Sequence, residues 1–110
     1  MKFEIFQSPK NKKYYFNLKA RNGQVILTSE GYEKMASAKA GVKSVVTNSK
    51  KMEQFDRKVA KNGKCYFNLV AANKKIVGGS QRYATQATME KGIKAVRRVA
   101  PEAVIVDMTK

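Results

Sequence analysis

Hydrophobic and polar residues alternate between residues 14 and 21. One parity is mainly apolar: Tyr14, Phe16, Leu18 and Ala20. The other parity is mainly polar: Tyr15, Asn17, Lys19 and Arg21. Because successive side chains of a strand point to opposite faces, this pattern predicts a strand with a buried face and an outward face.

The neighbouring segments complete a small α+β unit. Residues 3–6 and 24–29 are predicted strands, and Asn22-Gly23 between two strands is typical of a type I′ hairpin turn. From Glu33 to about Thr47 the apolar residues recur every three or four positions, which predicts an amphipathic helix.

The whole pattern occurs a second time, 51 residues later. Tyr15-Phe16-Asn17-Leu18 returns as Tyr66-Phe67-Asn68-Leu69, and further identical pairs keep the same offset as far as Val45 and Val96. A self-match of this length without a gap indicates an internal duplication. Repeat one is expected at about 1–49 and repeat two at about 50–110.

Repeat two predicts the same elements in the same order. Its strands are expected over residues 55–59, 65–71 and 75–77, and its helix carries Met89, Ile93 and Val96 with Thr85 as a possible N-cap. Pro101 should end that helix, and residues 103–107 form a last strand. Half-chains of this size are marginal alone, so residues 1–110 are expected to form a single domain with one shared core.

The two copies resemble a known family in their spacing. The first copy reads Tyr15-Phe16-x-Leu18-x-Ala20-x-Asn22-Gly23, continues with Val25-Ile26, Ser29 and Tyr32, and ends with Gly41-Val42-x-Ser44-Val45. The second copy matches at Tyr66, Phe67, Leu69, Ala71, Asn73, Val77, Ser80, Tyr83, Gly92, Ile93 and Val96. Over essentially the whole chain, this frame is similar to the YegP-like family of small bacterial proteins.

The resemblance implies a fold but no activity. The fold is α+β: two tandem β3αβ repeats forming one antiparallel sheet, with two helices packed on one face and the C-terminal strands exchanged between repeats. The sequence departs from the repeat at Lys74, where glycine is expected, and at Gly78-Gly79, where the first copy has Leu27-Thr28. Lys74 should therefore adopt a positive φ at some cost in stability.

Charge narrows the possible partners. The chain has 23 Lys and Arg against 8 Asp and Glu, a formal net charge of +15. This excess attracts polyanions, so DNA or RNA is the leading partner; the alternatives are an acidic protein partner or a charge that serves solubility alone. We expect no membrane association and a cytoplasmic location, because no apolar run is long enough to span a membrane, no signal-peptide core is present and cysteine occurs once. We also expect a monomer or homodimer.

Catalytic chemistry has few residues to use. Histidine is absent, and Cys65 has the inward parity of a small core residue. The acidic pairs Glu30/Glu33 and Glu53/Asp56 have no metal-ligand context, and a zinc site lacks ligands. The sequence therefore predicts a protein that is not an enzyme, with no cofactor and no metal.

Two surfaces could bind nucleic acid. The first is the outward sheet face, where aromatic rings and cations alternate as base stacking and phosphate binding require: Tyr15, Asn17, Lys19, Arg21, Tyr66 and Asn68. The second is a basic helix face: Lys39, Lys43, Lys91, Lys94 and Arg98. Either set could instead be an ordinary solvated surface, and the chain would then be a structural or protein-interaction module with no nucleic-acid role.

Two sets of glycine and serine positions need an explanation. Gly78-Gly79-Ser80 lies between a strand and a helix, where backbone amides can hold phosphate, although a strand bulge or tight exit is the simpler interpretation. Gly41 and Gly92 fall within the predicted helices, where glycine is unfavourable. They predict close packing of each helix against the sheet or the other helix.

Overall fold

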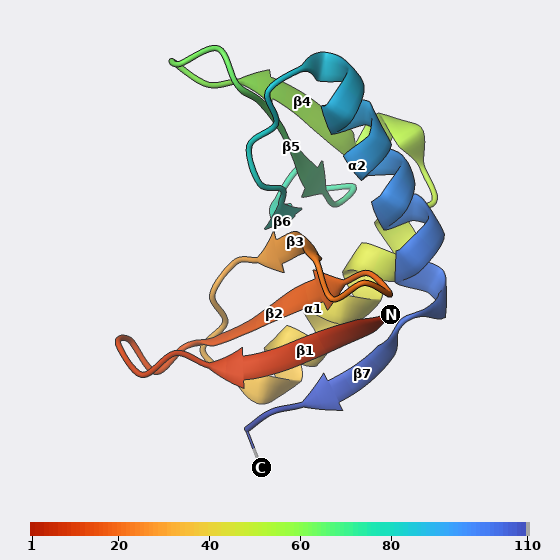
Figure 1. Ribbon diagram of the computed structural model, residues 1–110. Coiled ribbons are helices and arrows are strands. Elements are labelled where there is room, and N and C mark those ends of the chain that lie inside the picture. Colours follow the sequence, from red (N-terminus) through yellow and green to blue (C-terminus); the bar gives the residue numbers. More distant parts are fainter. Residues whose placement is uncertain (110) are drawn as a thin grey trace.

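The computed structural model describes residues 1–109, which form seven strands, two α-helices and two short 3₁₀ helices (Figure 1). The elements of repeat one are β1 (Lys2–Gln7), β2 (Tyr14–Lys19), β3 (Val25–Ser29) and α1 (Met35–Asn48), followed by η1 (Met52–Gln54). The elements of repeat two are β4 (Phe55–Val59), β5 (Cys65–Val70), β6 (Ile76–Gly79), α2 (Gln86–Val99), η2 (Ala100–Glu102) and β7 (Val104–Asp107). The α+β fold predicted from the duplication is confirmed.

The strands form one sheet in the order β4-β5-β6-β3-β2-β1-β7. Its centre is the antiparallel pair β3 and β6, in which Thr28 lies opposite Gly79. Gly79 is the repeat-two counterpart of Thr28, so the duplication places this residue opposite its own copy. An approximate twofold axis therefore passes through the middle of the sheet and relates the two repeats.

The C-terminal strand corrects one part of the expected topology. β7 pairs with β1 in parallel, whereas every other strand pair is antiparallel among residues 1–109, so the sheet is mixed. The amide of Val104 donates a hydrogen bond of 3.3 Å to the carbonyl of Met1. Both strands therefore begin at the same end of the molecule. The strand of repeat two that crosses to repeat one confirms the predicted exchange (Figure 1).

Both helices pack on one face of the sheet around a single core. The apolar parity of the strands is buried as predicted, together with the inner faces of α1 and α2: Phe3, Ile5, Phe16, Leu18, Leu27, Val42, Val45, Phe55, Phe67, Leu69, Ile93 and Val96. Cys65 packs at the edge of this core. Because α1 also contacts β6 and α2 also contacts β3, the helices join the two repeats.

The hairpin turns differ from the predicted type. In the turn after β2 the amide of Gly23 donates to the carbonyl of Ala20 across 2.9 Å, and only Gly23 has a positive φ, of 83°. Arg21 and Asn22 therefore form an ordinary type I turn that is followed by a left-handed residue, rather than a type I′ turn. The register of β2 against β3 shifts between Leu18 and Lys19 as a result.

Two lysines occupy left-handed positions. Lys74 has a φ of 68°, as its alignment with Gly23 predicts, and Lys12 has a φ of 63° at the position that aligns with Gly63. Each repeat thus has one glycine and one lysine at its two left-handed turn positions. The lysines carry the steric cost that glycine avoids.

The helix glycines make room for tyrosine side chains. A β-carbon at Gly41 would collide with the Tyr32 hydroxyl, and one at Gly92 would collide with the Tyr83 hydroxyl. Close packing is confirmed, although the neighbour is a tyrosine from the segment that precedes each helix. Burial raises the pKa of Tyr32, and the charge of Glu30 adds to the increase.

Gly78 and Gly79 form no phosphate-binding loop, because both lie inside β6. A β-carbon at Gly78 would lie 2.9 Å from the side chain of Leu27, so the glycine allows this core residue to cross the central strand pair. The predicted bulge lies elsewhere, between Leu69 and Val70 of β5.

Candidate nucleic-acid interface

The outward parity of β2 and β5 faces away from the helices. Asn17 pairs with Glu4 and with Thr28, and Asn68 pairs with Asp56 and with Gly79, so the centre of this face is a polar row. Tyr15 and Tyr66 lie further along the same two strands. Five of the six residues predicted for this surface are therefore brought onto one face.

Arg21 is the exception. The register shift after Leu18 and the turn that begins at Ala20 end the strict alternation, so Arg21 leaves the sheet. It lines a hollow of about 450 Å³ together with Arg98, which the sequence had assigned to the alternative surface.

The remaining cation of β2 already has a partner. The Lys19 ammonium lies 2.7 Å from the carboxylate of Glu4, and Lys2 lies 3.2 Å from the same group. The hydrogen bond from Lys19 lowers the pKa of Glu4, against an opposing effect of burial. The two lysines and the one carboxylate leave this part of the sheet face with a net charge of about one positive unit.

Tyr15 is also engaged within repeat one. Its ring stacks on Phe6 with centroids 5.8 Å apart, and Asn11 donates a hydrogen bond of 2.9 Å to its hydroxyl. A β-carbon at Gly31 would lie 3.0 Å from the ring, so Gly31 packs against it as well. Tyr66 has a different neighbour, because Arg82 takes the place of Gly31 and lies 4.8 Å from the ring centroid.

The predicted helix surface is divided between two helices. Lys39 and Lys43 are exposed on α1, whereas Lys91, Lys94 and Arg98 are exposed on α2. The sheet order places α1 and α2 over different halves of the sheet, with Lys43 at the repeat-one position that corresponds to Lys94. The five residues therefore do not form one patch around a common hollow.

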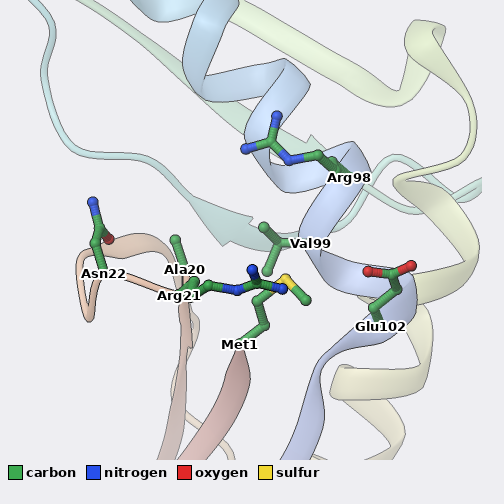
Figure 2. Close-up of a pocket in the computed structure, with 7 residues that line it drawn as sticks. All are labelled: Met1, Ala20, Arg21, Asn22, Arg98, Val99 and Glu102. Carbon is green, nitrogen blue, oxygen red and sulfur yellow. The ribbon is translucent and has the colours of Figure 1, made fainter.

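Several cationic side chains gather around the last turns of α2. Two adjoining hollows share Arg98 and are lined by five cationic side chains, called here the basic cluster: Arg21, Lys50, Lys94, Arg97 and Arg98. Figure 2 shows Arg21 reaching from the β2–β3 turn while Arg98 projects from α2, with Glu102 at the far side of the first hollow. Glu102 is the one acid among the residues that line the two hollows.

Hydrogen bonds orient part of the basic cluster. The Arg97 guanidinium donates to the carbonyls of Ser49 and Lys50, across 3.3 and 3.2 Å. These bonds hold the Arg97 side chain against residues 49–50, the linker between the repeats. Cations near a helix C-terminus also interact favourably with the helix dipole, so this arrangement is compatible with a stable α2.

Sequence reasoning missed Lys50 and Arg97. Lys50 lies at the expected boundary between the repeats, and Arg97 is one residue outside the helical row of Lys94 and Arg98. The available signal was the pair Arg97-Arg98, which replaces Val46-Thr47 of the first repeat. The contact between residues 49–50 and 97, nearly half the chain apart, could not be read from local pattern.

Within residues 1–109, no group of three or more His, Cys, Asp or Glu side chains could hold a metal ion. Neither helix of that part of the chain is long and apolar enough to span a membrane.

Comparison with known proteins gives one consistent result. The model of the family described as "Domain of unknown function (DUF1508)" matches twice, over residues 10–56 and 60–107. The UPF0339 protein YegP of Escherichia coli K12 is 46% identical over 107 residues, covering 97% of this chain and 96% of that protein. A UPF0339 protein of Acinetobacter baylyi is 47% identical over the same length, with the same coverage.

Two solved structures agree with these matches. The solution structure of E. coli YegP superposes with a TM-score of 0.92 at 44% identity, covering 98% of this chain and 92% of that one. The solution structure of a UPF0339 protein from Shewanella oneidensis gives a TM-score of 0.91 at 44% identity, covering 98% and 91%. The chain therefore belongs to the DUF1508 (UPF0339, YegP-like) family and carries two tandem copies of its domain.

Proposed function

We propose that this protein binds nucleic acid non-covalently, through the phosphate backbone, at the basic cluster. The observation that supports this best is the convergence of cations from three separate segments. The β2–β3 turn contributes Arg21, the linker contributes Lys50, and α2 contributes the other three. A net charge of +15 would add long-range attraction for a polyanion.

The duplication supports a role beyond folding for these cations. The repeat-one counterparts of Arg97 and Arg98 are Val46 and Thr47, and α1 forms a 14-residue helix with them, as long as α2. The shared fold therefore does not require arginine at either position. Val46 instead lines an apolar hollow with Ile105.

The chemistry of the basic cluster suits phosphate rather than base edges. Guanidinium groups bind phosphate oxygens through paired N–H donors, and lysine adds a mobile point charge. Phosphate contacts carry no sequence information, so the proposed binding has little sequence preference. The corresponding location is the cytoplasm, where such polyanions are abundant.

An acidic protein is the alternative partner, because the same cations would attract clustered carboxylates. Recognition of an acidic protein would depend less strictly on how the arginine side chains are oriented, because isolated carboxylates on flexible side chains can adapt their positions. We therefore expect nucleic acid to compete more strongly than polyglutamate at equal charge concentration.

The test compares two pairs of cations that change the net charge equally. Binding of labelled single- and double-stranded DNA is measured by fluorescence anisotropy at several salt concentrations. Lys94→Ala/Arg98→Ala should reduce the slope of log affinity against log salt by about 1.8 on duplex, roughly two phosphate contacts. The matched control, Lys39→Ala/Lys43→Ala on α1, should leave most of that slope intact.

Further outcomes separate the alternatives. Equal losses from both pairs would reject the basic cluster as a defined site and indicate a general charge effect. Competition by polyglutamate as strong as by DNA would favour the acidic protein partner. Absence of binding at low salt would reject nucleic acid.

A further inference from the structure

The outward sheet face has diverged between the two repeats. In repeat one its polar and aromatic residues are bonded to one another, whereas in repeat two the equivalent residues are open. Because both halves descend from one unit and share one fold, each difference can be compared position by position.

The first difference is at the centre of the sheet. In repeat one the Thr28 hydroxyl donates a hydrogen bond of 2.9 Å to the carboxamide of Asn17. In repeat two Gly79 replaces Thr28 and has no side chain to offer Asn68. Throughout residues 1–109 the Asn68 carboxamide has no hydrogen-bond partner, and its oxygen lies over Gly79, so closely that a β-carbon there would be only 3.0 Å away.

The second difference surrounds the tyrosine of each repeat. Tyr15 is covered by Phe6 and Gly31 and has a bonded hydroxyl. The corresponding positions around Tyr66 are Lys58, its cross-strand partner, and Arg82, whose guanidinium lies 4.8 Å from the ring centroid. An aromatic contact on the outward face of repeat one thus corresponds to a cationic surface in repeat two.

The tyrosine and arginine of repeat two border an open hollow, whereas Asn68 and Gly79 lie beside each other on β5 and β6, outside its lining. Tyr66 and Arg82 line it together with Lys61 and Val59, and its volume is about 480 Å³. Val59 is 71% exposed and provides an apolar side. Asp56 on this face is paired with Lys58 across 3.3 Å, whereas Arg82 and Lys61 make no ion pair within residues 1–109.

We infer that the repeat-two half of the sheet face, formed by Tyr66, Asn68, Gly79, Arg82 and Lys61, binds a nucleoside phosphate unit. The planar base stacks on the layer formed by Tyr66 and the Arg82 guanidinium, as aromatic and guanidinium planes do with bases. The carboxamide of Asn68 hydrogen-bonds the base edge, which the missing side chain of Gly79 allows to approach. Lys61 neutralises the phosphate.

This site is independent of the basic cluster. It lies on the opposite face of the sheet from α2 and shares no residue with the cluster. The same unit occurs as a free nucleotide and as an unpaired nucleotide of a single strand. Duplex DNA does not offer it, because its bases are stacked within the helix.

The experiment follows backbone amide signals of the full-length ¹⁵N-labelled protein during titration with adenosine 5′-monophosphate, adenosine or inorganic phosphate. The monophosphate should shift the amides of Tyr66, Asn68, Gly79 and Arg82. The amides of Tyr15 and Gly31 in repeat one, away from the β3–β6 pair, should stay in place and provide an internal control. Inorganic phosphate alone should reproduce little of this pattern, because it cannot stack.

Two variants convert repeat two into repeat one. Gly79→Thr supplies a hydroxyl that would hydrogen-bond to the Asn68 carboxamide. Arg82→Gly places beside Tyr66 the residue that packs against Tyr15 in repeat one. Arg82→Gly should weaken binding of the monophosphate roughly 5- to 100-fold, the range expected for loss of one stacked base. Gly79→Thr should weaken it roughly 2- to 10-fold, the range expected for loss of one hydrogen bond. The matched control, Thr28→Gly in repeat one, should leave the repeat-two shifts unchanged.

The outcomes of this titration can be distinguished from those of the binding test for the basic cluster. Lys94→Ala/Arg98→Ala should retain the shifts in repeat two even where it abolishes duplex binding. If a pentamer of deoxyadenosine shifts the same amides more than the monophosphate does, the ligand is an unpaired strand. If the monophosphate shifts them more than the pentamer does, the ligand is a free nucleotide. Equal shifts in both repeats, equal shifts with phosphate alone, or no shift with monophosphate or pentamer would overturn the inference.

Discussion

The hydroxyl of Tyr83 lies over Gly92 so closely that a β-carbon on the helix would overlap it. Tyr32 and Gly41 repeat this relationship in the other half of the molecule. In both repeats the tyrosine ring also stacks on a core phenylalanine, with centroids 6.5 Å apart for Phe67 and Tyr83. The tyrosine thus fills the space between the sheet and its helix.

Gly92→Ala should therefore destabilise the protein by about 1–3 kcal/mol, the usual cost of overpacking a filled core. Helix propensity alone would give the opposite sign, since alanine is favoured over glycine within a helix by roughly 0.5–1 kcal/mol. Urea unfolding of Gly92→Ala, Tyr83→Phe and the double variant measures the coupling. Additive effects, or a more stable Gly92→Ala, would show that the contact is unimportant.

Lys12→Gly and Lys74→Gly should each stabilise the fold by up to about 1 kcal/mol. A left-handed conformation costs a non-glycine residue roughly 1–2 kcal/mol, and the greater freedom of glycine in the unfolded chain offsets part of the gain. The reciprocal changes, Gly23→Lys and Gly63→Lys, should destabilise. Thermal melts at fixed salt compare all four variants, and a loss of stability in both lysine-to-glycine variants would contradict the argument.

The ion pair between Arg57 and Glu90 should contribute to stability only above moderately acid pH. The guanidinium of Arg57 on β4 donates to the Glu90 carboxylate on α2, with one N–O distance of 2.9 Å. This bond lowers the pKa of Glu90 below its usual value, against an opposing effect of burial. The stabilisation is complete above the unfolded pKa of about 4.3 and disappears as pH falls through the lower folded value.

Glu90→Gln should accordingly lose less than about 1 kcal/mol at neutral pH, because both partners are about one-third exposed. The difference from the unmodified chain should shrink as the solution is acidified. Glu102→Gln removes the same charge from a side chain that makes no ion pair within residues 1–109, and it serves as the control. A pH-independent difference for Glu90→Gln would indicate that the ion pair is not responsible.

Each half of the chain should be unable to fold alone as a monomer. Residues 1–50 lack β7, which covers the edge of β1, and they also lack β6, which completes the centre of the sheet. Circular dichroism and size exclusion should show either an unfolded half or a dimer. Mixing residues 1–50 with residues 51–110 should restore the native signal, and a half-chain that melts cooperatively as a monomer would contradict a shared core.

Sequence pattern was sufficient for the local elements and the buried faces. Alternation correctly separated Phe16 and Leu18 from Asn17 and Lys19, and Thr85 caps α2 as predicted, with its side chain accepting from the amide of Thr88 at 3.1 Å. These features depend on neighbouring residues, so they are visible in a short window.

Features that depend on contacts between distant parts of the chain could not be predicted from the same pattern. Parity placed Arg21 beside Lys19, but one register shift in β2 moved it to the end of α2. The ion pair of Lys19 with Glu4 requires the pairing of β1 with β2 to be known. The parallel direction of β7 follows from how α2 ends, which hydrophobic spacing does not specify.

Thr28 facing Gly79 has a consequence for how this molecule can evolve. In a homodimer of a single repeat, the residue on the twofold axis would face an identical residue, and any mutation would alter both sides at once. Joining the repeats in one chain removes that constraint, since each copy of the position mutates by itself. One side has kept a hydroxyl and the other has lost its side chain, an inequality that no symmetric assembly of identical subunits could encode.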